Sequence, residues 1–343
     1  MITDPSKDRF FAKWKRRCIS ITLYFLLWGL MTGTLPLILI IVGVMDWLRP
    51  LRKFGARFRC ILFFVLYLNC EILGLAAAFL IWLFSGVWLG RNRRFFVKAN
   101  YALQSFWASA LLKGAFFIFS VKLKTEGAEC AFPGPMVLMI RHASTADTVL
   151  ASVLVAKSFK MRLRFVLKQE LLWDPCLDVV GNRIPNVFVQ RDGKTTDREL
   201  AAIKDLSKDL SSRDGILIYP EGTRFQQHKL EKIQKRFKEQ ETPVISSMAA
   251  KFTHVLPPRI GGFSAITEAA PDADIVVCVH TGFEGSANFS EFWQGALIGK
   301  TVKVAFWRIP ACEIPSGRQE RRIWLFSEWM KVDEWVAQNF SGV

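Results

Sequence analysis

The segment Met136-Val137-Leu138-Met139-Ile140-Arg141-His142-Ala143-Ser144-Thr145-Ala146-Asp147 joins an apolar run to a polar turn. Five apolar residues in succession are typical of a strand buried on both faces, and the polar residues after them mark its end. Ser144 or Thr145 is suited to cap a helix that follows. Asp147 then falls in the first turn of that helix, where a carboxylate is favourable. The segment therefore predicts a strand, a turn and a helix.

The same alternation continues along the chain. We expect strands at 121–125, 136–141, 163–167, 187–190, 215–219, 275–280 and 302–308, and helices at 146–158, 197–212, 229–240 and 318–338. This order predicts an α/β domain with a mostly parallel sheet and flanking helices. Functional side chains of such a sheet gather where strands end. The highly charged stretch 226–242 predicts a solvated surface helix and loop rather than a site.

A second apolar run also ends in polar residues, in the segment Ile216-Leu217-Ile218-Tyr219-Pro220-Glu221-Gly222-Thr223-Arg224. In the first segment, four residues separate His142 from Asp147. Together the two segments resemble the H-x4-D and E-G-T-R motifs of the glycerolipid acyltransferases, the family of 1-acyl-glycerol-3-phosphate acyltransferases. The resemblance covers roughly residues 120–310 and implies a glycerolipid acyltransferase-like fold.

The resemblance implies a general base. Asp147 would accept a hydrogen bond from His142 Nδ1, which fixes the tautomer and leaves Nε2 free to take a proton. The nucleophile would be the hydroxyl of the substrate, which attacks a thioester carbonyl. A backbone donor near His142 is expected to hold the oxyanion.

The second motif implies an acceptor site. Gly222 lets the backbone turn sharply after the strand. Arg224 offers a planar fork suited to a phosphate, and Thr223 can donate to the same group. Glu221 would bind a glycerol hydroxyl or orient Arg224.

Arg191 is a further phosphate candidate, since Phe188-Val189-Gln190-Arg191 resembles the G-x-x-F-x-x-R block of the family. The nearest preceding glycine, Gly181, departs from that pattern because it stands seven residues before Phe188 instead of three.

Two weaker matches and one departure complete the expected site. Lys168, in a lysine-glutamine-glutamate-leucine stretch, is expected to reach the same phosphate or to be a solvated lysine. Pro257 and Pro258 stand where the family has a proline-containing block on the acyl-donor side, and Arg259 after them is a departure. Arg141, directly before the histidine, either lies beside the imidazole or points away from it.

The N-terminal third predicts attachment to a membrane. The apolar runs 19–45 and 61–89 each exceed the roughly 20 residues needed to cross a bilayer. Segments 1–17, 46–59 and 91–98 flank them with a net charge of +4 each, which favours anionic lipid headgroups. No nucleic-acid recognition motif accompanies this charge, so we expect no nucleic-acid partner.

The topology of this membrane motif has two solutions. Two full spans would place the basic loop 46–59 on the far side, against the positive-inside rule. A re-entrant pair, bent near Gly29, Gly33 and Pro36, keeps all three basic segments on one side and is favoured. Residues 99–120 form either an interfacial helix or an ordinary core helix.

We therefore expect membrane-anchoring helices at 1–98, an interfacial helix or linker at 99–120, and the α/β acyltransferase domain at 121–343. The seven cysteines form no C-x-x-C pair, which favours reduced thiols and a catalytic domain on the cytoplasmic face of the membrane. The four histidines lack metal-ligand spacing, so no structural zinc is expected.

The resemblance implies acylation of lysophosphatidic acid at sn-2, which gives phosphatidic acid. The acyl donor would be acyl-CoA or acyl-carrier protein, with no further cofactor. One alternative is acylation of another lysophospholipid or a lyso-aminolipid. A second is a non-catalytic membrane lipid-binding protein.

Overall fold

A seven-stranded sheet forms the centre of the computed structural model, which describes residues 10–48, 53–144, 146–190, 197–284 and 289–340. Its strand order is β1-β7-β6-β2-β5-β3-β4. The strands are β1 (Lys122–Glu126), β2 (Met136–Ile140), β3 (Arg162–Lys168), β4 (Val187–Val189), β5 (Asp214–Ile218), β6 (Asp274–Thr281) and β7 (Thr301–Ile309). Only the β6–β7 pairing is antiparallel among the pairs described, which confirms the expected mostly parallel sheet.

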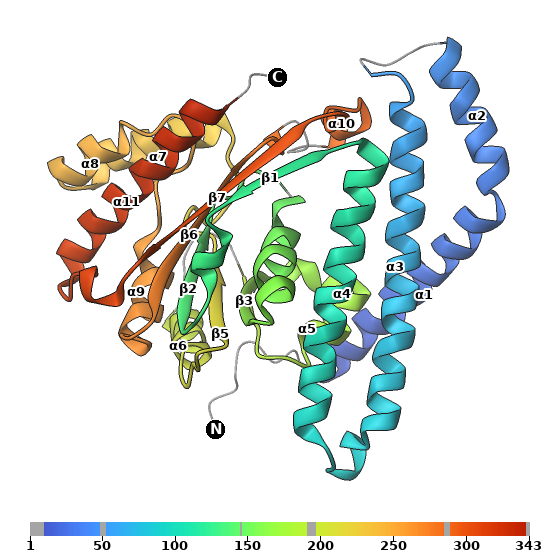
Figure 1. The fold of residues 1–343 in the computed structure, drawn as a ribbon, viewed down its shortest axis with the longest axis horizontal. Coiled ribbons are helices and arrows are strands. Elements are labelled where there is room, and N and C mark those ends of the chain that lie inside the picture. Colours follow the sequence, from blue (N-terminus) through green and yellow to red (C-terminus); the bar gives the residue numbers. More distant parts are fainter. Residues whose placement is uncertain (1–9, 49–52, 145, 191–196, 285–288, 341–343) are drawn as a thin grey trace.

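Helices cover both faces of this sheet, as Figure 1 shows. They are α1 (Phe10–Gly33), α2 (Leu35–Leu48), α3 (Ala56–Ser85), α4 (Arg93–Phe119), α5 (Pro175–Gly181), α6 (Asp197–Leu206), α7 (Gln227–Gln240), α8 (Pro243–Ala249), α9 (Ile260–Ala269), α10 (Phe289–Trp293) and α11 (Arg318–Asn339). Helices α6–α9 and α11 pack on one face, and α3 and α4 reach the other. The fold is therefore a layered α/β domain joined to an N-terminal group of long helices.

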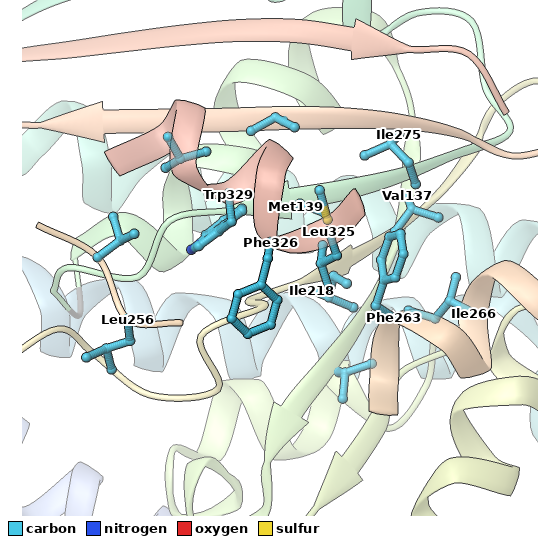
Figure 2. Packing of buried hydrophobic residues seen from close by; sticks show 14 of the residues in the cluster. Val137, Met139, Ile218, Leu256, Phe263, Ile266, Ile275, Leu325, Phe326 and Trp329 are labelled. Atoms are coloured by element: carbon cyan, nitrogen blue, oxygen red, sulfur yellow. The ribbon is translucent and has the colours of Figure 1, made fainter. Parts of the chain in front are cut away.

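Strand β2 shows why the sheet is central. Its five residues are all buried and alternate between two cores. Val137 and Met139 join the core under α9 and α11, where Figure 2 shows Phe263 and Trp329. Met136, Leu138 and Ile140 face the core that α3 and α4 cover. A strand buried on both faces needs no polar alternation, which explains the uninterrupted apolar run.

The N-terminal helices fit a membrane by length and composition. Ala56–Leu89 and Arg93–Phe119 are each long and apolar enough to cross one. Helices α1 and α2 pass the same test as a pair, but they are bent by 68° at their break. The break falls between Gly33 and Leu35, close to the expected bend. The first helix of the expected two-helix motif is therefore divided into α1 and α2, and α3 is its second helix.

Helix α4 crosses the expected boundary between residues 98 and 99 without interruption. Residues 99–120, expected to be an interfacial or a core helix, form its C-terminal part and include buried core residues, while the interfacial role stays a prediction. Leu112 and Phe119 are buried in the core beneath the sheet. Phe106 and Phe117 remain 68% and 87% exposed on the helix surface. The segment is thus a core helix on one side and an apolar surface on the other.

The N-terminal helices are fastened to the α/β domain by buried polar contacts. Asp178 of α5 is fully buried and accepts hydrogen bonds from Arg16 Nη2 at 3.0 Å and Arg17 Nη2 at 3.0 Å. Glu71 of α3, also fully buried, accepts from Trp107 Nε1 at 2.9 Å and from the Cys176 backbone N–H at 3.0 Å. These contacts fix α1, α3 and α4 against α5.

Candidate active site

The carboxyl ends of neighbouring parallel strands bring the expected site residues together. Strand β2 pairs with β5 on one side and with β6 on the other, all three in the same direction. His142 follows β2 and Glu221 follows β5, while Lys168 ends β3, the strand beyond β5. Because these strands end at one edge of the sheet, residues far apart in the sequence meet there.

His142 and Asp147 form the expected pair. His142 Nδ1 lies 3.1 Å from Asp147 Oδ1, and the Asp147 side chain is fully buried. Asp147 Oδ2 also accepts from the backbone N–H groups of Ala143 at 2.7 Å and Ser144 at 2.8 Å. These donors lock the carboxylate in place. The His142 ring packs against Tyr219 with centroids 4.5 Å apart, and 12% of its side chain remains exposed.

The expected regular helix after this turn begins differently. Residues Ala146–Val149 form a 3-10 turn, and Ser152–Lys157 form π-helical turns. Ser144 Oγ accepts from the Ala146 N–H at 2.9 Å, as a capping side chain does. Because Asp147 binds the backbone at 143 and 144, the chain winds tightly around its carboxylate. Thr145, the other expected cap, lies outside the described residues.

The Glu221 side chain is buried and connects two backbone segments, so it is not an exposed group that could bind the acceptor. It is 1% exposed, Oε1 accepts from the His142 N–H at 2.7 Å, and Oε2 accepts from the Leu256 N–H at 2.9 Å. Burial raises the pKa of Glu221 to about 8, against these two N–H donors, which lower it. The expected contact of Glu221 with a glycerol hydroxyl has no support in this geometry, because both oxygens face backbone amides.

The backbone donors nearest to His142 are already engaged. The N–H of His142 binds Glu221, those of Ala143 and Ser144 bind Asp147, and that of Ala146 binds Ser144 Oγ. Thr145 lies outside the described residues, so among the described N–H groups of positions 142–146 none is left for an oxyanion.

Positive side chains gather beside the turn of the second motif. Gly222 has φ +70°, the left-handed conformation that favours glycine. Lys229 Nζ donates to Thr223 Oγ1 at 3.2 Å and to the Arg224 carbonyl at 3.3 Å. Burial lowers the pKa of Lys229, and the charges of Arg224 and Lys168 lower it further. Arg191 lies outside the described residues.

Lys229 belongs to the stretch 226–242, which the sequence predicts to be a solvated surface helix and loop, and it contacts the turn of the second motif. Its helix, α7, also buries Leu230 and Phe237 in the core, so one face of the charged stretch is internal. The signal was present in these apolar residues, which stand seven positions apart and fit one side of a helix.

A pocket of about 110 Å³ adjoins this cationic cluster. It is lined by Val166, Val189, Gln190, Glu199, Ile203, Ile218, Tyr219, Pro220, Gly222, Arg259, Gly261, Gly262 and Phe263. A Cβ on Gly222 would lie 2.8 Å from Arg259 Nε, so the absence of a side chain makes room for the guanidinium. Pro257 and Pro258 are buried beside Leu256 and do not line the pocket.

Arg141 points away from His142. It is 1% exposed, and its Nη1 binds Glu284 Oε1 at 2.6 Å and the His280 carbonyl at 2.5 Å. Burial raises the pKa of Glu284, but the neighbouring Arg141 guanidinium lowers it more, and the pKa is below its usual range. His280, a residue that sequence reasoning missed, lies behind the site, with Nε2 3.6 Å from Asp147 Oδ2. Its position at the end of an apolar strand was the available signal.

Among the described residues, no group of three or more His, Cys, Asp or Glu side chains is placed to hold a metal ion. The side chains brought together here are the His142–Asp147 pair, the buried Glu221 carboxylate and the cations of the second motif.

A family model, a relative and a solved structure match parts of this chain. The family model described as Acyltransferase matches residues 122–281. The 1-acyl-sn-glycerol-3-phosphate acyltransferase epsilon of Mus musculus is 26% identical over 219 residues, which cover 60% of this chain and 58% of the mouse protein. The crystal structure of the 1-acyl-sn-glycerophosphate (LPA) acyltransferase PlsC of Thermotoga maritima aligns with a TM-score of 0.42 and 14% identity, over 78% of this chain and 98% of that one.

The matched range contains both sequence motifs and the strands from β1 to β6. This confirms the resemblance that the motifs indicated. Residues 122–281 therefore carry an acyltransferase domain, and the chain is similar to a 1-acyl-sn-glycerol-3-phosphate acyltransferase of the glycerolipid acyltransferase type.

Proposed function

We propose that this protein transfers a fatty acyl chain from an acyl thioester to the free hydroxyl of a lysophospholipid. The proposed acceptor is lysophosphatidic acid, acylated at sn-2 to give phosphatidic acid. The observation that carries the proposal is the His142–Asp147 pair, 3.1 Å apart, at the same strand edge as the cations of the second motif. The family name of the mouse relative supports the same class of acceptor.

The pair supports a sequential mechanism with one proton cycle. Asp147 keeps the proton of His142 on Nδ1, so that Nε2 is the base. Nε2 takes the proton of the acceptor hydroxyl as the oxygen attacks the thioester carbonyl. The tetrahedral intermediate then collapses, the carbon–sulfur bond breaks, and the proton on Nε2 passes to the leaving thiolate.

The cationic cluster supports a phosphorylated acceptor. Arg224, Lys168 and Lys229 provide positive charge close to the turn at Gly222. Arg224 can hold a phosphomonoester through two parallel N–H donors, and Lys229 adds a point charge. The donor, acyl-CoA or acyl-carrier protein, enters the proposal only as a co-substrate.

Arg259 favours one alternative, in which the acceptor is another lysophospholipid or a lyso-aminolipid. It adds a cation to the pocket beside Gly222, at a position where the chain departs from the family pattern. Arg183, by contrast, is committed to the fold, because its Nη1 binds the Ala78 carbonyl at 2.6 Å.

A product assay tests the proposal. The full chain in nanodiscs is given an acyl-CoA together with lysophosphatidic acid, lysophosphatidylglycerol, lysophosphatidylethanolamine and a lyso-aminolipid, and mass spectrometry identifies the products. Phosphatidic acid as the dominant product supports the proposal. Preferred acylation of another lysolipid favours the alternative acceptor. No product from either acyl-CoA or acyl-carrier protein contradicts the proposed activity and favours a lipid-binding protein.

Replacing Arg224 with alanine should raise KM for lysophosphatidic acid about 10- to 100-fold and change kcat much less. A charge-assisted contact of this kind contributes roughly 1.5–3 kcal/mol of binding. Initial rates across a range of acceptor concentrations measure both constants. Lys232→Ala, on the exposed side of α7, is the matched control. An unchanged KM would exclude Arg224 from the phosphate site.

A further inference from the structure

His280 is a buried titratable group that the proposed mechanism does not use. It lies on β6, which pairs with β2, and it is fully buried. Its Nε2 lies 3.6 Å from Asp147 Oδ2, while His142 Nδ1 lies 3.1 Å from Asp147 Oδ1. The aspartate therefore faces two imidazole rings, that of His142, which is partly exposed, and that of His280, which is fully buried.

The hydrogen bonds of His280 fix its protonation state. Nε2 lies 3.0 Å from the Arg141 carbonyl oxygen, and because a carbonyl only accepts, this nitrogen carries the proton. Nδ1 has no hydrogen-bond partner in the part of the chain that the structure describes. A second proton on Nδ1 would therefore be a buried, unsatisfied donor, which is costly. The geometry holds this imidazole neutral.

The groups around His280 agree with a neutral ring. Arg141 and Asp147 both follow β2. Glu284 follows β6 and forms an ion pair with Arg141 at 2.6 Å. Cys278, also on β6, is a buried thiol whose pKa burial raises. Burial lowers the pKa of His280, an effect that the charge of Asp147 opposes and that of Arg141 strengthens.

We propose that His280 is a positioning residue for acyl transfer, which holds the end of β2 through the Arg141 carbonyl and places the same neutral N–H near Asp147, with Nε2 3.6 Å from Oδ2. The inference rests on the base role proposed for His142. The bond to Arg141, the residue directly before His142, fixes the backbone from which the base projects. This N–H, together with those of Ala143 and Ser144, stabilises the carboxylate charge of Asp147 and so weakens its effect on His142.

Removing this N–H should therefore strengthen the pull of Asp147 on a protonated His142. The base would then stay protonated to higher pH, and the acid limb of the pH–rate profile would move upward. A side chain with a purely structural role would change the amount of folded enzyme but not the position of that limb.

A matched pair of variants separates these roles. His280→Gln keeps an N–H donor on a side chain of similar length, and His280→Met removes it. We expect His280→Met to lower kcat about tenfold, to leave acceptor KM within about twofold, and to move the acid limb upward by roughly one pH unit. His280→Gln should restore most of the rate and the original limb. A wild-type profile for His280→Met, or equal losses in both variants with an unmoved limb, would overturn the inference.

A second measurement does not depend on turnover. The full chain has four histidines, so imidazole nitrogen NMR of histidine-labelled protein in nanodiscs can be assigned by single substitutions. His280 should remain neutral, with its proton on Nε2, well below the ordinary histidine range near pH 6.5. The titration of His142 should move to higher pH in His280→Met and not in His280→Gln. If His280 titrates as an exposed histidine does, or if neither variant moves His142, the inference is wrong. A wild type that transfers no acyl chain would instead contradict the proposed function.

Discussion

Replacing His142 with alanine is expected to lower kcat for acyl transfer by about a thousandfold. Loss of a general base typically costs 10²- to 10⁴-fold in rate, and the other imidazole beside Asp147, that of His280, is fully buried and cannot replace it. The fold should survive, since residue 142 donates its backbone N–H to Glu221, and alanine keeps this donor. Product formation at saturating substrates, measured by mass spectrometry, gives kcat.

His228→Ala is the control for this experiment, because His228 is exposed on α7. It should keep the wild-type rate. Nanodisc binding and melting temperature of the His142 variant should match the wild type. A His142→Ala enzyme that retained a tenth of the wild-type kcat would exclude His142 as the base.

Asp178→Asn is expected to release α1 from the α/β domain. The carboxylate is fully buried and binds two guanidinium groups that are themselves 11% and 15% exposed. Removing one partner of a buried ion pair costs about 3–5 kcal/mol, because the remaining charges stay desolvated and unpaired. We expect a melting temperature lower by roughly 5 °C or more, and rapid tryptic cleavage after Arg16 and Arg17.

Asp205→Asn provides the comparison for this variant. Asp205 pairs with Lys208, and the two side chains are 71% and 62% exposed, so the pair is screened by water. Its loss should leave both the melting temperature and the tryptic pattern unchanged. If Asp178→Asn behaved in the same way, the buried pair would not be what holds α1.

Local patterns were sufficient for most of the fold. Each expected strand is present within one or two residues of its predicted bounds, because buried strands produce short apolar runs with clear ends. The two motifs could be placed at one edge, since both follow parallel strands. Helix α9 was missed because Ile260–Ala269 contains Gly261 and Gly262, which disfavour helix, and packing of Phe263 and Ile266 on the sheet decides its structure.

The inner part of the site depends on contacts that no local pattern carries. Glu221 was expected to bind a glycerol hydroxyl or to orient Arg224, but its partners are the amides of His142 and Leu256, which become neighbours only when the strands pair. The contact of His280 with Asp147 likewise arises because β6 and β2 are adjacent in the sheet. Side-chain chemistry could therefore be predicted from sequence, whereas the direction of each side chain required the strand order.

Helix α1 is attached to the α/β domain near its N-terminal end, at Arg16 and Arg17, so its remaining length limits how deeply it can enter the bilayer. From Arg17 to Gly33 the helix rises about 24 Å at about 1.5 Å per residue, less than the roughly 30 Å of bilayer hydrocarbon. Helix α2 then departs at 68°. A bent first helix of this length favours the re-entrant motif expected from the sequence, and an enzyme held in this way should work as an interfacial catalyst. Its rate should follow the surface density of lysolipid and fall when inert lipid dilutes the leaflet, even at constant bulk concentration.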